Sequence, residues 1–311
     1  MVDEEVLGAA ASLIREGKLV AFPTETVYGL GANALDPEAV ARIFEVKGRP
    51  FTSPIIVHVQ SVEMARNLVE RWPDSAERLA KKFWPGPLTL VLRKHTKLPD
   101  VVTGGLDTVG LRVPAHPVAL ELLRISGVPI AAPSANRFSE LSPTTAEHVR
   151  RALGNSIEMI VDGGPSTVGI ESTVLSLCDN TPVLLRPGMI SQPDIEAMIG
   201  PIQAMLGVVP SGAHPSPGLH PRHYSPRTSL FLVTQGRVPK RGNGMYIGFE
   251  ARAKAARTMI LPLEPAAYAA ELYQILHEAD NGNWDWIAVE CPPDTPEWAG
   301  ILDRLQRAAQ K

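Results

Sequence analysis

The chain has 311 residues, of which 44% are hydrophobic, with a formal net charge of −3 and a pI of about 6.3. This length is typical of two domains, and the charge argues against a nucleic-acid-binding surface spread over the whole protein. Cys178 and Cys291 stand alone, which argues against structural zinc and a disulfide framework. The acidic N-terminus does not resemble a signal peptide, and no apolar run is long enough to cross a membrane. We therefore expect a cytoplasmic protein.

From residue 3 to about residue 200, short helices alternate with short apolar strands. Asp3 can cap a helix that ends near Gly17, and the apolar run at 19–22 indicates a buried strand. A second helix should start after Asp36, with Pro37 at its first position. Further strands are expected at 55–59, 88–92, 108–113, 128–132, 157–161, 172–177 and 183–185, and further helices from Ser61 to Leu68 and from Ser142 to Leu153. Neighbouring strands are close enough for hairpins, which predicts a mixed sheet.

The composition changes over residues 201–227, where six prolines exclude a helix or a central strand. We interpret this segment as a semi-rigid linker between a first domain at 1–200 and a smaller α/β domain at 228–311. Its Arg222, His223 and Tyr224 suit ligand contact better than a plain spacer requires. The small domain is expected to contain strands at 229–233, 245–248 and 286–290, and helices at 265–279 and about 296–309.

The stretch Pro23–Gly31 places two threonines, a glutamate and a tyrosine on the loop that follows the first strand. Ligands of open α/β sheets bind at the carboxyl ends of strands, and hydroxyls there can hold a small polar ligand. The glycines would let the backbone approach that ligand or turn sharply. The pattern Gly29-x-Gly31-x-x-Ala34 also matches a loose dinucleotide-binding fingerprint. That fingerprint needs a helix that begins inside the glycine loop, whereas Asp36 and Pro37 place the helix start beyond it, which disfavours a Rossmann dehydrogenase.

Other polar groups of the first domain also lie beside predicted strands. Singly, each has an ordinary structural explanation: Lys47 and Arg49 as a solvated helix end, His58 as a core histidine. Arg112 lies inside a strand and needs either a buried partner or a polar cleft. Together the basic and hydroxyl side chains suit an anion with several phosphates, and the set comprises Lys47, Arg49, Arg112, Arg186, Thr24, Thr26, Ser134, Ser142 and Ser172. There is no P-loop, HExxH or GxSxG motif, so these residues indicate a polyphosphate-binding α/β enzyme without a covalent nucleophile and leave its reaction open.

These residues fall into ordered blocks that resemble the YrdC-like family. The blocks are Pro23–Gly31, Lys47–Pro50 with Pro54–Val59, Trp84–Leu90, Thr108–Pro114, Ala132–Asn136, Asp162–Pro165, Val168–Thr173 and Leu185–Gly188. The segment 216–226 and the domain after it resemble the longer, two-domain branch of that family. One departure is Ser139, where relatives often have glycine.

The resemblance implies a twisted open mixed sheet with a concave basic cleft, followed by a smaller Rossmann-like α/β domain. It implies a nucleotidyltransferase that makes L-threonylcarbamoyl-AMP from L-threonine, bicarbonate or CO2, and ATP, with release of pyrophosphate. Mg2+ would arrive with ATP. The product would pass to a tRNA threonylcarbamoyl-transferase complex that modifies the adenosine next to the anticodon, and any direct contact with tRNA would be weak.

The resemblance also implies roles for individual residues. Lys47 and Arg49 would be catalytic, and the proline-rich linker would close the site as a lid. L-threonine would be held by Thr26, His58, Arg112 and Ser172, with Arg112 taking its carboxylate. ATP would be held by Lys47, Arg49, Ser53, Thr108, Ser134, Asn136, Ser142, Arg186 and Tyr224, with His223 as a further candidate. No dedicated metal site is expected.

Two alternatives belong to other classes of protein. An RNA-binding module could use the same basic cleft. The negative net charge, the low aromatic content of 5% and the absence of a Lys/Arg stripe argue against it. A hydrogenase-maturation carbamoyltransferase would need acylphosphatase-like and zinc-finger segments, which this sequence lacks.

Overall fold

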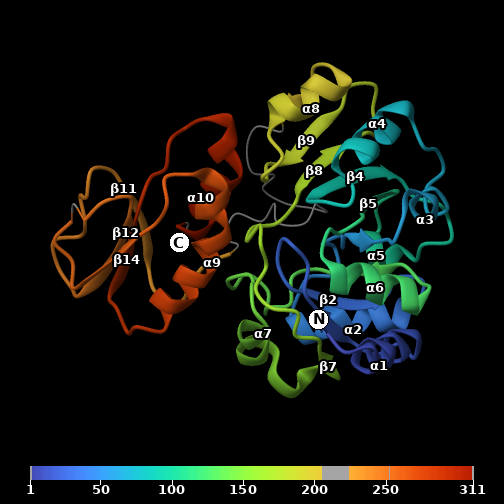
Figure 1. Ribbon diagram of the computed structural model, residues 1–311, viewed down its shortest axis with the longest axis horizontal. Coiled ribbons are helices and arrows are strands. Elements are labelled where there is room, and N and C mark those ends of the chain that lie inside the picture. Colours follow the sequence, from blue (N-terminus) through green and yellow to red (C-terminus); the bar gives the residue numbers. More distant parts are fainter. Residues whose placement is uncertain (1, 205–223, 252, 310–311) are drawn as a thin grey trace.

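The computed structural model describes residues 2–204, 224–251 and 253–309, which form two α/β units (Figure 1). The large unit contains α1 (Glu4–Arg15), β1 (Val20–Phe22), β2 (Gly29–Asn33), α2 (Pro37–Lys47), β3 (Val57–His58), α3 (Val62–Arg66), α4 (Asp74–Phe83), β4 (Leu88–Arg93), α5 (Asp100–Thr103), β5 (Thr108–Arg112), α6 (Pro117–Ser126), β6 (Ile130–Ala131), α7 (Ala146–Leu153), β7 (Met159–Ile160), β8 (Thr173–Ser176), β9 (Val183–Arg186), α8 (Gln192–Ile199) and β10 (Gln203–Ala204). The small unit contains β11 (Leu230–Val233), β12 (Gly244–Gly248), β13 (Arg257–Ile260), α9 (Pro265–Asp280), β14 (Trp286–Glu290) and α10 (Ala299–Ala308).

The large unit is built on a ten-stranded sheet with the order β10-β9-β8-β4-β5-β3-β6-β2-β1-β7. Its strands pair both ways: β8 with β9 and β4 with β5 are antiparallel, whereas β4 with β8 and β3 with β5 are parallel. The mixed sheet expected from hairpin-length connections is therefore confirmed. The small unit has a four-stranded parallel sheet with the order β11-β14-β12-β13.

Both faces of the large sheet are buried, as the alternation in its first strand shows. Ala21 belongs to the core on one face, while Val20 and Phe22 belong to a second core on the other. The second core includes Ile14 of α1 and Leu122 of α6. Covered on both sides, the sheet can expose polar side chains only at its edges and at its strand ends.

The helix α2 begins where the sequence predicts, but the two glycines before it do not lie on the predicted loop. The Asp36 carboxylate accepts hydrogen bonds from the N–H groups of Glu38 and Ala39, so the helix begins at Pro37, well past the glycines. Gly29 and Gly31, expected on a loop, lie instead in β2. A Cβ on Gly31 would come within 2.8 Å of Phe22 Cε1, so this glycine allows close packing in the core rather than approach to a ligand.

Other sequence expectations were incomplete or wrong. Ser142 does not open a helix, because its hydroxyl donates to Glu171; α7 starts at Ala146, capped by Thr145. The sequence patterns also did not predict α4, α5, α6, α8 and β13. One reason is that α6 is capped by His116, an unusual capping residue. Another is that β13 is a largely exposed edge strand with little apolar periodicity.

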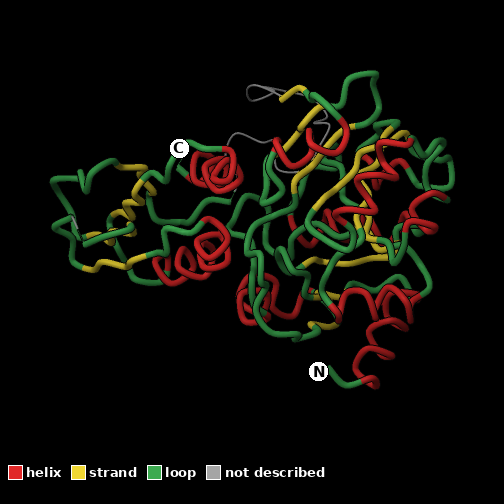
Figure 2. Tube along the Cα trace, turned by 45° about the horizontal axis from the view of Figure 1, so that its top comes forward, coloured by secondary structure: helices red, strands yellow, loops and turns green. Residues whose placement is uncertain are grey.

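The helices of the small unit, α9 and α10, lie between its own sheet and the large unit (Figures 1 and 2). The apolar core around them includes Val27, Leu141 and Ile170 from the large unit. Most of the predicted linker (205–223), with His223 and the lid interpretation, lies outside the described residues, so the domain division at 200 and 228 stays a prediction. In the part of the chain that the structure describes, no helix is long and apolar enough to cross a membrane.

Candidate functional site

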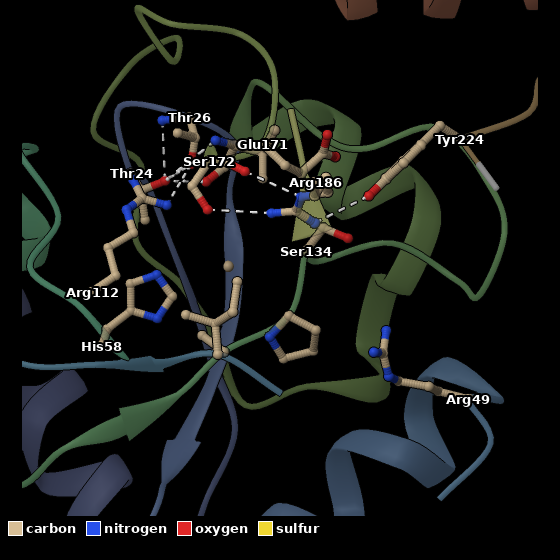
Figure 3. A pocket seen from close by; sticks show the side chains of 15 residues that line it. Thr24, Thr26, Arg49, His58, Arg112, Ser134, Glu171, Ser172, Arg186 and Tyr224 are labelled. Atoms are coloured by element: carbon tan, nitrogen blue, oxygen red, sulfur yellow. Dashed lines mark hydrogen bonds between the residues drawn. The ribbon is translucent and has the colours of Figure 1, made fainter. Parts of the chain in front are cut away.

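A hollow lies where several strands of the large sheet end or begin (Figure 3). The loop after β1, the end of α2, β3, the end of β5 and the segments after β6 and before β8 contribute to its walls, together with the end of β9 and Tyr224. Nine of the residues singled out from the sequence line it: Thr24, Thr26, Arg49, His58, Arg112, Ser134, Ser172, Arg186 and Tyr224. The strand-end rule therefore brought most of the candidate residues to one place.

Arg112 lies at one end of this cavity, and its guanidinium is held on three sides. Its Nε donates to the carbonyl of Gly86 over 3.2 Å, and its Nη1 donates to Thr26 Oγ1 over 2.9 Å. Its Nη2 lies 2.6 Å from Glu25 Oε1, a buried ion pair. The approach is not aligned as a hydrogen bond, and no described residue donates a well-aligned one to either Glu25 oxygen. The cation thus has a counter-charge and still keeps hydrogen-bonding capacity.

His58 lies near Arg112 in the same part of the cavity (Figure 3). Burial, with the Arg112 charge as a second cause, lowers the pKa of His58 to about 3. The imidazole is therefore neutral at neutral pH. No residue in the described ranges hydrogen-bonds its Nδ1, which leaves one ring nitrogen available to a ligand.

Ser172 and Arg186 form the middle of the cavity as one hydrogen-bonded pair. Arg186 donates from Nε to the Ser172 carbonyl over 3.1 Å and from Nη2 to the Ser172 hydroxyl over 3.2 Å. The same hydroxyl lies 2.8 Å from Thr89 Oγ1. Arg186 Nη1 donates to the Tyr224 hydroxyl over 3.4 Å (Figure 3), and burial lowers the pKa of Arg186. Arg186, the last residue of β9, thus contacts Tyr224, which lies 38 positions later in the chain.

Arg49 lies away from Arg112, at the far side of the cavity (Figure 3). It donates to the Pro54 carbonyl over 2.9 Å, and its Cζ lies 5.9 Å from the centre of the Phe138 ring. Burial lowers the pKa of Arg49 to about 10, so it stays charged at neutral pH. Its hydrogen-bond acceptors are neutral carbonyls, in contrast to the carboxylate beside Arg112.

The structure does not bring five predicted ATP residues to the cavity wall: Lys47, Ser53, Thr108, Asn136 and Ser142. Lys47 Nζ donates to the carbonyls of Ser134, over 2.6 Å, and of Asn136, and burial lowers its pKa well below the usual value. The Asn136 amide donates to the Arg137 and Glu140 carbonyls, so both residues shape this loop.

The remaining members of that group have other surroundings. Thr108 starts β5, opposite Arg93 and at the other end of the strand from Arg112. Ser142 is buried against Glu171. The Ser53 carbonyl lies 3.5 Å from Nε of Arg49, a residue of the cavity wall.

Sequence reasoning assigned no site role to two acidic groups at or beside the cavity. Glu171 lines it, and Glu25 pairs with Arg112 behind it. Arg112 lies inside a strand and needs a buried partner, and this need could have pointed to Glu25. No local pattern pointed to Glu171, a residue that is 7% exposed and whose carboxylate accepts from Ser142, Tyr273 and Arg304.

Three buried guanidinium groups around one cavity, with hydroxyls and a neutral imidazole, define a site for an anionic ligand beside a small polar one. No group of three or more His, Cys, Asp or Glu in the described ranges is arranged to hold a metal ion. The fold and the site thus define an anion-binding α/β enzyme of the YrdC-like class.

Comparisons with known proteins agree with this class. A family model described as telomere recombination matches residues 12–188, and one described as the C-terminal domain of threonylcarbamoyl-AMP synthase matches residues 190–310. The threonylcarbamoyl-AMP synthase of Bacillus subtilis (strain 168) is 43% identical, covering 97% of this chain and 92% of that protein. That of Pyrococcus abyssi is 42% identical, covering 99% of this chain and 95% of that protein. This chain belongs to the threonylcarbamoyl-AMP synthase family.

A solved structure supports the same assignment over both units. The crystal structure of P. abyssi Sua5 complexed with L-threonine matches with a TM-score of 0.93 at 42% identity. The match covers 99% of this chain and 95% of that one. The large mixed sheet and the small parallel sheet are therefore shared with that protein.

Proposed function

We propose that this chain makes L-threonylcarbamoyl-AMP from L-threonine, bicarbonate or CO2, and MgATP, with release of pyrophosphate. The observation that supports this most is that one cavity has two chemically different ends. Arg112, Thr26 and the neutral His58 lie at one end, and Arg49 lies at the other, with Arg186 bonded to the Tyr224 hydroxyl between the two ends. Sequence similarity to threonylcarbamoyl-AMP synthases over nearly the full length of the chain supports the same reaction.

L-Threonine would occupy the end beside Arg112. Its carboxylate would take the remaining N–H groups of Arg112, and its hydroxyl would bond the open Nδ1 of His58. Thr26 and Ser172 supply hydroxyls on the neighbouring wall. The side chains here are buried, so water competes little for these hydrogen bonds.

ATP would occupy the end beside Arg49, with Arg49 and Arg186 on its phosphates and Ser134 and Tyr224 on the adjoining wall. Lys47 and Asn136 would act through the loop that carries Ser134, since their side chains bond its carbonyls. Thr108 and Ser142 have no direct role in this proposal. Mg2+ would enter as part of the MgATP substrate, held by phosphate oxygens and water.

The chemistry requires positioning and charge neutralisation, and no covalent enzyme intermediate. The threonine amine takes up CO2 to form an N-carboxylate, whose oxygen attacks the α-phosphorus of ATP as the bond to pyrophosphate breaks. Arg49 and Arg186 would stabilise negative charge that develops on the phosphates. A cavity lined by buried side chains would also protect the carbamate and the mixed anhydride from water.

The product is a reactive mixed anhydride and must be consumed soon after release. We propose that it passes to a tRNA threonylcarbamoyl-transferase complex in the cytoplasm, with at most a weak contact between this chain and tRNA. Direct RNA binding by the cavity is disfavoured, because Arg49, Arg112 and Arg186 are only 6%, 3% and 2% exposed. Cations enclosed in a cavity can take a single nucleotide, whereas a continuous polynucleotide backbone needs cations on an open surface.

The decisive assay is pyrophosphate release from MgATP by the purified chain, with mass-spectrometric detection of threonylcarbamoyl-AMP. We expect release only when both L-threonine and bicarbonate are present, and little when L-alanine replaces L-threonine. ATP turnover that ignores threonine would contradict the proposal. So would tight RNA binding without any turnover.

A further inference from the structure

A single buried arginine of the small unit contacts the two segments that deliver Ser172 and Arg186 to the cavity. Arg304, on α10, is 1% exposed. Its Nη2 donates over 3.1 Å to the backbone carbonyl of Glu171, the residue before Ser172. Its Nη1 donates over 3.0 Å to the carbonyl of Pro187, the residue after Arg186. One guanidinium plane therefore fixes both neighbours of the central pair in the cavity.

The side chain of Glu171 completes this connection. Arg304 Nε donates to Glu171 Oε2 over 2.6 Å, and the Tyr273 hydroxyl on α9 lies 3.2 Å from the same oxygen. The guanidinium also lies over the ring of Tyr224, 5.4 Å from its centre. Glu171 and Tyr224 line the cavity, so Arg304 lies directly behind its wall.

The backbone around Arg304 is shaped for close approach. A Cβ on Gly300 of α10 would lie 2.7 Å from the Cα of Gly188, next to Pro187. A Cβ on Gly169, near Glu171, would lie 2.1 Å from the Ala269 carbonyl of α9. These glycines let α9 and α10 approach both segments closely enough for Arg304 to reach two carbonyls. The motifs at 168–173 and 185–188 thus serve docking as well as ligand contact.

We propose that Arg304 is a positioning residue, through which the docked small unit fixes Ser172 and Arg186 in their ligand-binding orientation. The inference rests on the proposed function for what those two residues bind. A planar guanidinium is required, because its three nitrogens donate to different acceptors. Nε donates to the Glu171 carboxylate, Nη1 to the Pro187 carbonyl and to Asp303, and Nη2 to the Glu171 carbonyl. An ammonium at this position would leave at least one buried acceptor without its donor.

The test compares Arg304→Lys with Arg307→Lys in the full-length chain. Arg307 lies on the same helix and shares Asp303 as a partner, whereas the hydrogen bonds to the Glu171 and Pro187 carbonyls described here come from Arg304. We expect Arg304→Lys to lower kcat/KM for ATP by about ten- to a hundredfold, with KM clearly raised. Arg307→Lys should retain normal values. A purely structural role would lower only the active fraction, and hence kcat, with KM unchanged.

Amide hydrogen exchange gives a readout that does not depend on turnover. Residues 171–173 and 185–188 should exchange faster in Arg304→Lys than in the wild-type chain or Arg307→Lys. Gly300→Ala provides a second variant, since its methyl group would separate α10 from Gly188 without touching the cavity. It should show the same raised KM and the same local increase in exchange.

The outcomes separate the two proposals. A wild-type chain without synthase activity overturns the proposed function, and the exchange data then still decide the role of Arg304. An active wild-type chain, with Arg304→Lys indistinguishable from Arg307→Lys in KM and exchange, overturns the positioning role. If Arg304→Lys does not fold, normal KM and normal exchange in Gly300→Ala overturn it equally.

Discussion

The two ends of the cavity balance their buried charges differently. Beside Arg112 a carboxylate, Glu25, lies 2.6 Å away, so the net charge there is already close to zero. At the other end, Arg49 and Lys47 hydrogen-bond neutral backbone carbonyls, and burial lowers the pKa of both. A free amino acid is a zwitterion with no net charge, and it suits the balanced end. A triphosphate carries several negative charges, and it suits the end where Arg49 donates its described hydrogen bonds to neutral carbonyls. The difference in charge balance thus matches two different substrates.

The sharpest way to break this comparison is Arg49→Ala. If Arg49 supplies positive charge to the phosphates, the variant should lose about a hundredfold or more in kcat, as when one transition-state donor is removed. Pyrophosphate release measures the loss. Arg42→Ala is the matched control, because Arg42 lies on the same helix, α2, but pairs with Glu158 at the surface. Normal turnover in folded Arg49→Ala would mean that the carbonyl-bound cations are structural only.

The substitution Arg112→Lys tests whether L-threonine binds at the end of the cavity where Glu25 balances the charge of Arg112. An ammonium cannot keep Gly86, Thr26 and Glu25 as partners and also bind a carboxylate in two places. We expect the Kd for L-threonine to rise about tenfold or more, with a much smaller change for ATP. Calorimetric titration of each ligand separately measures both values, and Arg93→Lys on the neighbouring strand is the control. Equal losses for the two ligands would remove the distinction between the ends.

The sequence predicted those parts of the molecule whose signals are local. The apolar run before Pro23 and the Asp36–Pro37 cap correctly placed β1 and α2. The rule that ligands bind at the carboxyl ends of strands correctly brought Thr26 and Arg112 together, whereas Ser172 lies just before β8, at its amino end. In each case the information lies within a few residues of the chain or in the general geometry of a sheet.

The contacts that the sequence did not predict are tertiary. Lys47 looked like a phosphate ligand, but it bonds the carbonyls of a loop almost ninety residues away. Glu171 and Arg304 are separated by 133 positions, and neither lies in a pattern that indicates its partner. Such contacts follow from how α10 docks on the large unit, which no short-range periodicity encodes.

His58 gives the Arg112 end a measurable pH signature. Its pKa is about 3 in the folded chain against an ordinary value of 6.5, because burial and Arg112 disfavour the charged ring. Between these values the unfolded chain binds the proton and the folded chain does not, so the free energy of unfolding falls as the pH is lowered. One such group contributes up to about 1.4 kcal/mol per pH unit.

Urea unfolding at a series of pH values between 6.5 and 4 tests this contribution. We expect a shallower decline of the unfolding free energy in His58→Asn than in the wild-type chain. Addition of L-threonine to the wild-type chain should raise the stability across the range without removing the slope. Identical slopes for the variant and the wild-type chain would show that His58 is not held neutral by its surroundings.

The smallest expected effect concerns Ser139, on the loop beside the Arg49 end. Its φ is 66°, a left-handed conformation that costs a residue with a Cβ about 1–2 kcal/mol. Ser139→Gly removes that strain but adds about 0.5–1 kcal/mol of unfolded-state entropy, so we expect a net gain of about 0.5 kcal/mol. Ser126→Gly is the matched control: each serine donates to a nearby carbonyl, over 2.7 Å in Ser139 and 3.2 Å in Ser126, but Ser126 lies in α6. The control should lose stability, so the two substitutions should differ in sign when both are measured by chemical unfolding. Two losses of similar size would mean that the left-handed backbone at Ser139 carries no strain.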